Sequence, residues 1–193
     1  LRLTPITPTT IRISFVKGVT GTIQDTNWKA QADTAVTWSA KESRSEVQLL
    51  TDRILIRVEK ANGAVQFLSR DGKKLLTENP SEPRLLLDTQ TWNFFAWDKN
   101  ERLKSKGVLA DDFMDLSTKA RYISFGQKKL RMPLVLSNKG YAIGVAAGST
   151  VLFCNVRTYG QYLYTQGTGQ IDYYFIYDEN QERIIEQYRN LPV

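Results

Sequence analysis

The stretch TDRILIRVEKANGAVQFLSRDGKKLLTE, residues 51–78, decides the fold class. In residues 54–58, Ile54, Ile56 and Val58 share one face, as a strand with one buried face requires. The Asn-Gly pair at 62–63 predicts a two-residue hairpin turn, and the apolar alternation resumes at 65–67. An Asp-Gly pair at 71–72 predicts a second turn that leads into KKLLTE. This stretch therefore predicts an antiparallel meander.

Short apolar or alternating segments recur on both sides of this meander. IDYYFIY, residues 171–177, is apolar or aromatic on both faces except at Asp172, which predicts a central strand covered on each side. Residues 31–45 are mostly polar and predict a loop with one strand. The other predicted strands are residues 11–16, 36–40, 84–87, 91–97, 121–125, 133–137, 141–146, 150–156 and 159–166.

The end of the chain carries the helical pattern. Asp178 and Asn180 are candidate N-caps, and Pro192 ends the segment. The apolar residues that recur at helical spacing are Ile184, Ile185, Tyr188 and Leu191. Many short strands followed by one helix predict an all-β fold, an antiparallel β-sandwich with one C-terminal helix. We find no linker that would divide residues 1–193, so we predict a single domain.

Composition excludes several kinds of catalytic site. Histidine is absent from the 193 residues, which excludes Ser-His-Asp and Cys-His triads and most zinc sites. The single cysteine, Cys154, lies in the strand-like segment VLFCNV and is predicted to be a buried, inert thiol. The glycines fall in turns and no carboxylates have calcium-loop spacing, so we predict no metal site and no cofactor.

The net charge of +6 is thinly spread. Its densest stretch contains Lys128, Lys129 and Arg131, with Arg121 nearby, and carries no RRM, KH or zinc-finger motif. We interpret it as a solvated face and predict no nucleic-acid partner. No apolar run reaches the roughly 18 residues of a membrane span. The sequence assigns no compartment.

Two groups of residues are candidates for binding or catalysis. The carboxylates Asp111, Asp112 and Asp115 could perform acid–base chemistry or accept hydrogen bonds from a ligand's hydroxyl groups, although a solvated turn is the favoured interpretation. The aromatic stretch TWNFFAWD, residues 91–98, could form a platform on which a ligand's ring stacks. In a strand, one pair of its rings would face opposite to the other pair, so at least one pair is predicted to lie in the core. The same alternatives hold for Tyr159, Tyr162 and Tyr164.

Several segments resemble glycoside hydrolase family 31. The order of strand, Asn-Gly turn, strand, Asp-Gly turn and Leu-Leu in residues 51–78 resembles the opening of many α-glycosidases. MPLVLSNKGYAIGV, residues 132–145, resembles the family's P-F-x-x-S-x-x-G-Y-G strand pair, and GQIDYYFIYDENQERIIEQYRNL, residues 169–191, resembles its x-D-Y-Y-F-I-x-G strand and the helix that follows. TPTTIRISFV, residues 7–16, is similar to its first strand. The likeness spans nearly the whole chain in the family's order.

This resemblance implies an N-terminal β-sandwich of the galactose-mutarotase-like type that precedes a (β/α)8 catalytic barrel. In the family both catalytic aspartates lie on barrel strands, so this chain is expected to contain no catalytic residue and to be inactive alone. The implied partners are the barrel of the same polypeptide, in an α-glucosidase or α-xylosidase, and carbohydrate. An independent carbohydrate-binding β-sandwich is the alternative. Direct aldose epimerisation is rejected because it would require histidine.

The family also assigns a role to residues 107–131. The corresponding loop reaches over the barrel and can contact the substrate through an acidic residue, although GVLAD here replaces the family's Y-G-L-G. The resemblance implies Asp111, Asp112 and Gln127 as candidate substrate-binding residues. It also predicts that the apolar strip of the terminal helix, together with exposed aromatic positions, is exposed until the barrel packs on it.

Overall fold

The computed structural model describes residues 1–16, 36–106, 113–123, 133–146, 151–166 and 169–191. These residues form antiparallel strands in three sheets and one α-helix, which confirms the predicted all-β sandwich with a C-terminal helix. The bounds are β1 Arg2–Thr7, β2 Thr10–Val16, β3 Trp38–Glu42, β4 Glu46–Thr51, β5 Ile54–Glu59, β6 Val65–Ser69, β7 Lys74–Thr77, β8 Arg84–Leu87, β9 Gln90–Phe94, β10 Leu103–Lys106, β11 Phe113–Asp115, β12 Ala120–Tyr122, β13 Leu134–Ser137, β14 Tyr141–Val145, β15 Val151–Val156, β16 Gly160–Gln166, β17 Gln170–Tyr177 and α1 Gln181–Arg189.

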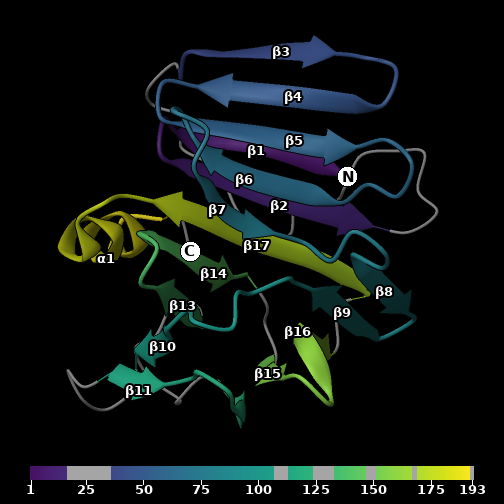
Figure 1. Cartoon of the computed structure of the whole chain (residues 1–193), viewed down its shortest axis with the longest axis vertical. Helices are drawn as coiled ribbons and strands as arrows, with labels where there is room; N and C mark the ends of the chain where they lie inside the picture. The colour runs from purple at the N-terminus through teal and green to yellow at the C-terminus, as the bar shows by residue number, and fades with distance from the viewer. Residues whose placement is uncertain (17–35, 107–112, 124–132, 147–150, 167–168, 192–193) are drawn as a thin grey trace.

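One layer of the sandwich is a seven-stranded sheet in the order β1-β2-β17-β14-β13-β10-β11. The strand predicted to be central, β17, lies between β2 and β14 and pairs antiparallel with both. Its neighbour β2 belongs to the first 16 residues, whereas β14 spans residues 141–145. Strand β17 therefore joins the N-terminal hairpin β1–β2 to the later strands of this sheet (Figure 1).

The second layer consists of two five-stranded sheets, β3-β4-β5-β6-β7 and β12-β15-β16-β9-β8. A single β-bridge between Glu78 and Phe95 connects them. Two backbone hydrogen bonds flank this bridge, from Asn79 to Phe94 and from Ala96 to Thr77. In Figure 1 the first of these sheets lies over β1, β2 and β17.

The main core lies between the two layers. Phe175 of β17 stacks on Phe67 of β6 with ring centroids 4.0 Å apart, and on Tyr141 of β14 at 5.5 Å. Buried apolar side chains of this kind exclude water from the space between the sheets and supply most of the driving force for folding. The contacts confirm that the apolar alternation of the strands marks their inner faces.

Helix α1 corrects the prediction of an exposed apolar strip. Ile184, Tyr188 and Leu191 are buried, and Ile185 is half-buried. The three buried residues pack on the outer face of the seven-stranded sheet, where Tyr174 and Ile176 of β17 form part of the same cluster. Because β17 is apolar on both faces, its outer face needs a cover, and this chain supplies one itself. The strip is therefore not free to dock another domain.

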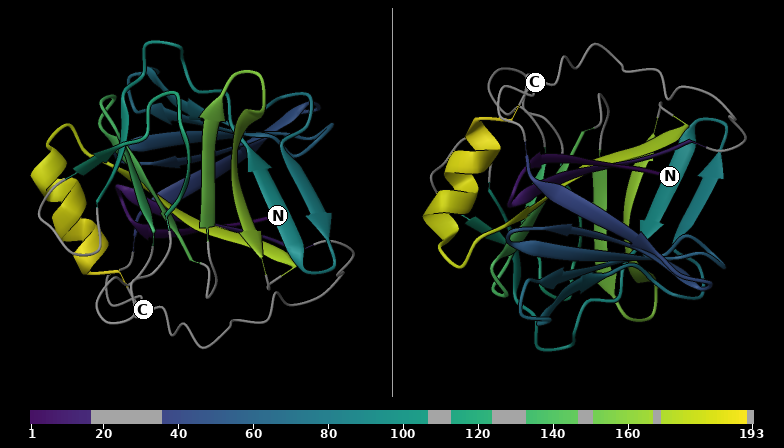
Figure 2. Two further views of the ribbon diagram at one scale, coloured as in Figure 1. Left: turned by 90° about the horizontal axis from the view of Figure 1, so that it is seen from below. Right: turned by 90° about the horizontal axis from the view of Figure 1, so that it is seen from above.

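Asn180 is the N-cap of α1, and its side chain accepts a hydrogen bond from the backbone N–H of Glu182 at 2.8 Å. Asp178, the other candidate, accepts one from the N–H of Asn180 at 2.9 Å. Both residues therefore order the turn that leads into the helix. In both views of Figure 2, α1 lies across the molecule from the β8–β9 hairpin.

Both predicted hairpin turns are present, but the first is longer than the two residues predicted. Glu59 and Ala64 are hydrogen-bonded across the first turn, and Ser69 and Lys73 across the second. The φ of Gly63 is +75°, but Asn62 does not have a positive φ, which a two-residue type I′ turn would need. Instead, the Asn62 side chain accepts a hydrogen bond from the N–H of Ala64.

The β13–β14 turn depends on glycine. Gly140 has a φ of +85°, and a Cβ atom there would lie 2.9 Å from the carbonyl oxygen of Asp178. This agrees with the prediction that the glycines fall in turns.

Candidate functional site

The predicted substrate-binding residues Asp111, Asp112 and Gln127 lie outside the described residues. So do Lys128, Lys129 and Arg131 of the basic stretch. The remaining carboxylate of the acidic group, Asp115, is described.

Asp115 is exposed at the end of β11 and accepts a hydrogen bond from the N–H of Ser117 at 3.0 Å. It also pairs with Lys119 at 3.8 Å. These contacts fit the favoured interpretation of a solvated turn.

Among the described residues, no three His, Cys, Asp or Glu side chains gather in a way that could hold a metal ion. The predicted burial of Cys154 is confirmed, and its thiol lies 3.4 Å from the carbonyl oxygen of Gly160. Within the described part of the chain, no helix has the length and apolarity needed to cross a membrane.

The aromatic stretch divides as the strand alternation predicts. Phe95 and Trp97 are buried in the core and stack with centroids 5.0 Å apart. Trp92 and Phe94 lie on the opposite, outer side of β9 and are half-buried. One pair of rings is thus available at the surface.

These outer rings belong to a continuous surface. Trp92 pairs with Tyr164 of β16, with ring centroids 4.9 Å apart, and Phe94 pairs with Tyr162 at 5.8 Å. Strand register places Leu152 beside Tyr164 on one side of this pair and Leu85 beside Trp92 on the other. We call this surface the aromatic face, and its residues are Leu85, Leu87, Trp92, Phe94, Leu152, Tyr162 and Tyr164.

Glu78 is the most completely buried carboxylate among the described acidic residues, with an exposed fraction of 0%. Its Oε1 accepts hydrogen bonds from Asn93 Nδ2 and the Tyr173 hydroxyl, both at 3.0 Å. Its Oε2 accepts one from the N–H of Val65 at 2.9 Å and pairs with Arg84. Because four donors occupy this carboxylate, we assign it to structure rather than to substrate chemistry.

A small cavity lies between the layers beside this network, lined in part by Thr91, Asn93, Thr165 and Tyr173. It has room of about 20 Å³ for the centres of water molecules. That space suits about one water molecule, whereas small-molecule sites typically enclose roughly 300–1,000 Å³. Asn93 Oδ1 has no hydrogen-bond partner among the described residues, so the cavity has a polar wall. It is not a sugar site.

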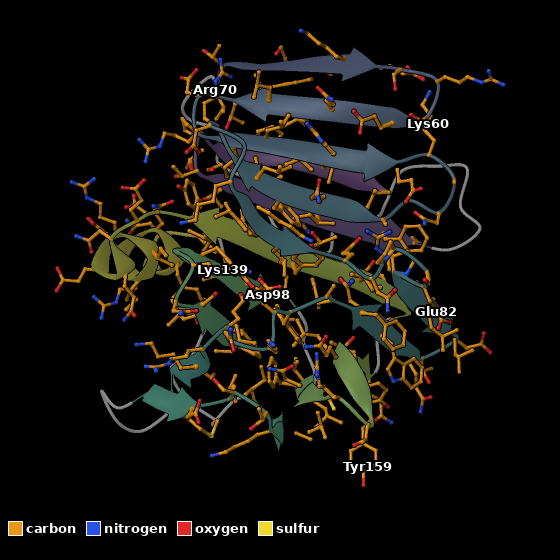
Figure 3. All side chains as sticks on the ribbon, in the orientation of Figure 1. Lys60, Arg70, Glu82, Asp98, Lys139 and Tyr159 are labelled. Carbon is orange, nitrogen blue, oxygen red and sulfur yellow. The ribbon has the colours of Figure 1, made fainter. Side chains whose placement is uncertain are left out.

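Glu101 forms a second buried carboxylate site. It accepts hydrogen bonds from Ser137 Oγ at 2.6 Å and from the Tyr141 hydroxyl at 2.5 Å. Lys139 Nζ lies 3.1 Å from its other oxygen and also pairs with the exposed Asp98, which is labelled beside it in Figure 3. These contacts hold the loop before β10 against the β13–β14 turn.

The two carboxylates raise the pKa of the tyrosines that they contact. Burial raises the pKa of Tyr173 well above its ordinary value, and the charge of Glu78 raises it further. Burial and then Glu101 do the same for the pKa of Tyr141. Burial lowers the pKa of Lys139, but its hydrogen bonds to Asp98 and Glu101 outweigh that effect and raise it overall.

We expect the free energy of unfolding to fall as pH rises above about 10, the ordinary tyrosine pKa. A group whose folded-state pKa is raised stabilises the protein fully below its unfolded pKa, and this contribution is lost as pH rises towards the folded pKa. Between the unfolded and folded pKa values, each buried tyrosine should therefore lower the free energy of unfolding by about 1.4 kcal/mol per pH unit. Urea unfolding at pH 8 to 11 measures the fall.

The variant Tyr141→Phe serves as the comparison for this experiment. It should be less stable at neutral pH, because Glu101 loses a donor, but its decline above pH 10 should be shallower. Tyr159→Phe, at a position 76% exposed on the β15–β16 turn, should follow the unmodified protein. Parallel alkaline declines in all three proteins would contradict the prediction.

No protein-family model and no curated protein sequence matches this chain. Solved structures do match it. A GH31 dextranase from Flavobacterium johnsoniae, complexed with glucose, superposes with a TM-score of 0.79 and 18% identity over 98% of this chain and 25% of its own. The cycloalternan-forming enzyme of Listeria monocytogenes has a TM-score of 0.76 and 16% identity, over 97% of this chain and 19% of its own. A GH31 α-xylosidase from a soil metagenome has a TM-score of 0.72 and 16% identity, over 98% of this chain and 32% of its own.

The fold is therefore that of a β-sandwich domain found in carbohydrate-active enzymes. More particularly, it is the fold of one domain of glycoside hydrolase family 31 enzymes, as the sequence resemblance predicts. The chain spans between a fifth and a third of the length of the structures that it matches.

Proposed function

We propose that this chain is the non-catalytic N-terminal domain of a family 31 glycoside hydrolase of the α-glucosidase or α-xylosidase type. Residues 1–193 would form one galactose-mutarotase-like domain that packs on a (β/α)8 catalytic domain of the same polypeptide and helps to wall its carbohydrate pocket. The observation that carries this proposal is the fold match over nearly all of this chain but only 19–32% of the matched enzymes.

The chemistry of the described residues supports a non-catalytic role. Retaining glycoside hydrolysis needs two carboxyl groups about 5–5.5 Å apart across the sugar. Glu78 and Glu101 are instead buried and hydrogen-bonded to structural partners. Asp111, Asp112 and Gln127 remain our proposed substrate contacts.

Activity assays test this proposal. The 193-residue chain and the longer polypeptide that contains it are incubated with isomaltotriose and with the 4-nitrophenyl α-glucoside and α-xyloside. We expect no turnover by the chain alone and turnover by the longer polypeptide. Hydrolysis by the chain alone, or the lack of a barrel-encoding sequence next to it in its gene, would overturn the proposal.

The aromatic face supports a second candidate, an independent carbohydrate-binding module. Half-exposed rings such as those of Trp92 and Tyr164 can stack on the apolar faces of sugars. Titration of the chain with isomaltotriose, maltotriose and xylotriose separates the two candidates. Millimolar or tighter binding that Trp92→Ala abolishes would favour the module, and no binding would favour the scaffold.

A further inference from the structure

We propose that the aromatic face is the surface on which the catalytic domain packs, an inference that rests on the proposed function. The prediction from sequence placed that contact on the apolar strip of α1 and on exposed aromatic positions, and this chain buries the strip itself. The outward side of α1 instead presents charged residues, namely Glu182, Arg183, Glu186 and Arg189. The contact must therefore use another surface.

Absence of charge distinguishes the aromatic face. The row of residues that crosses its centre reads Leu152, Tyr164, Trp92 and Leu85 from strand to strand. The next rows add Phe94 and Tyr162 on one side, and Leu87, Gln90 and Gln166 on the other. None of these described residues is charged, although 24% of the chain is.

The sister sheet of the same layer provides an internal comparison. The corresponding row on the outer side of β3 to β6 reads Lys41, Gln48, Arg57 and Gln66. Glu59 and Lys74 also lie on that side and are exposed. The next row on that side reads Ser39, Leu50, Leu55 and Leu68, so the outer face of the sister sheet mixes leucines with charged residues. Charged residues at such positions are typical of a surface in contact with water, whereas the described residues of the aromatic face include none.

The pattern on the aromatic face matches the anatomy of a protein interface. Interface centres are depleted of charge and enriched in aromatic residues, and their rims are polar. Leu85 and Leu87 of β8 are 37% and 50% exposed, and the charged Glu82 and Asp88 flank the strand at its two ends. A core of rings and leucines is thus bordered by charged residues.

Ring geometry favours a protein domain over a glycan as the occupant. Trp92 and Tyr164 are inclined to one another by 49°, and Phe94 and Tyr162 by 71°. Such rings form an uneven surface rather than a flat platform for successive sugar rings, and the exposed leucines beside them offer no hydrogen bonds. Uneven apolar surfaces suit interdigitating side chains, and the matched enzymes contain several hundred further residues per chain that could supply them.

Hydroxyl-radical footprinting of the 193-residue chain and of the longer polypeptide tests the proposal. We expect labelling of Trp92 and Tyr164 to fall by about threefold or more in the longer polypeptide, because an interface centre excludes water. Trp38 is the matched control, since it is 53% exposed on β3 of the sister sheet and should be labelled equally in both. Equal labelling of Trp92 in both proteins would overturn the proposal.

Two further arms identify other occupants. If isomaltotriose protects Trp92 in the chain alone, the occupant of the aromatic face is a glycan. If protection grows with the concentration of the chain, the occupant is a second copy of the chain. Either result overturns the proposal. The activity assay reports separately on the proposed function, so an active longer polypeptide with an unprotected Trp92 refutes only this docking face.

The variant Leu87→Lys provides an independent readout. Because Leu87 is exposed, this charge should leave the melting temperature of the chain alone unchanged. In the longer polypeptide it should lower the melting temperature, since a buried interface would receive an unpaired charge. Ser39→Lys is the matched control, because Ser39 is exposed on the edge strand β3 of the sister sheet opposite Leu50, and it should change neither. An unchanged melting temperature for Leu87→Lys in both proteins would count against the proposal.

Discussion

Replacement of Glu78 by alanine is expected to lower the free energy of unfolding by about 3–5 kcal/mol. The side chain is fully buried, and its removal leaves the guanidinium of Arg84 without its carboxylate partner in a site where the Arg84 side chain is only 4% exposed. It also removes the acceptor of the Tyr173 and Asn93 hydrogen bonds. This loss is a large fraction of the total stability of a typical domain, which is about 5–15 kcal/mol.

Position explains why this carboxylate matters. Glu78 lies at the bridge that joins the two sheets of the second layer, and Tyr173 belongs to β17 of the first layer. Arg84 and Asn93 come from β8 and β9. One side chain thus fixes the sister sheets to each other and to the opposite layer.

Urea unfolding followed by circular dichroism measures the effect, and Glu78→Gln keeps it measurable if the alanine variant does not fold. Glutamine preserves an acceptor for Tyr173 but not the charge opposite Arg84, so the free energy of unfolding should fall less in Glu78→Gln than in Glu78→Ala. Glu42→Ala is the exposed control: its side chain is 70% exposed in the pair with Lys60, and little change is expected. Equal losses in Glu78→Ala and Glu42→Ala would refute the assigned role.

The sequence was sufficient for features that depend on local pattern. The shared apolar face of residues 54, 56 and 58 and the two-sided apolarity of residues 171–177 predict strands that the structure confirms as β5 and the central β17. Helical spacing and the Asn180 cap likewise predict α1. In each case a few neighbouring residues contain the whole signal.

Features that depend on distant partners were not predictable in this way. Strand β1 contains a proline and polar residues that are tolerated because it is an edge strand, and the short β10 shows no clear alternation. The apolar strip of α1 was correctly located, but which surface covers it depends on strand order. Glu78 ends an ordinary strand segment, and its burial follows only from β8, β9 and β17 meeting there.

The candidate site illustrates the same limit. Strand alternation correctly separates the rings of residues 91–97 into a core pair and an outer pair, although β9 ends at Phe94 rather than at residue 97 as predicted. Alternation cannot show that Tyr164, Tyr162 and Leu85 complete that outer surface, because they reach it through pairing of β16 and β8 with β9.

The variant Asp172→Leu is expected to have a free energy of unfolding lower by about 3–5 kcal/mol, because Arg12 would remain buried and unpaired. The guanidinium donates to both carboxylate oxygens at 2.9 and 2.6 Å, and Ser14 Oγ lies 3.3 Å from one of them. Both side chains are less than a tenth exposed. Replacing the pair together, as Arg12→Leu with Asp172→Leu, should recover most of the loss, since buried ion pairs rarely exceed apolar packing in stability.

If the pair contributes little net stability, its role lies in the register of β2 against β17. Alternation fixes register when one face is apolar and the other polar, but β17 is apolar on both faces, so a one-residue slip would still bury apolar side chains. A bidentate contact between Arg12 and Asp172 tolerates no such slip. The double leucine variant should therefore unfold at a urea concentration near that of the unmodified protein, yet show doubled or broadened amide signals for β2 and β17 in NMR spectra. A single sharp set of signals would show that the remaining contacts fix the register without the ion pair.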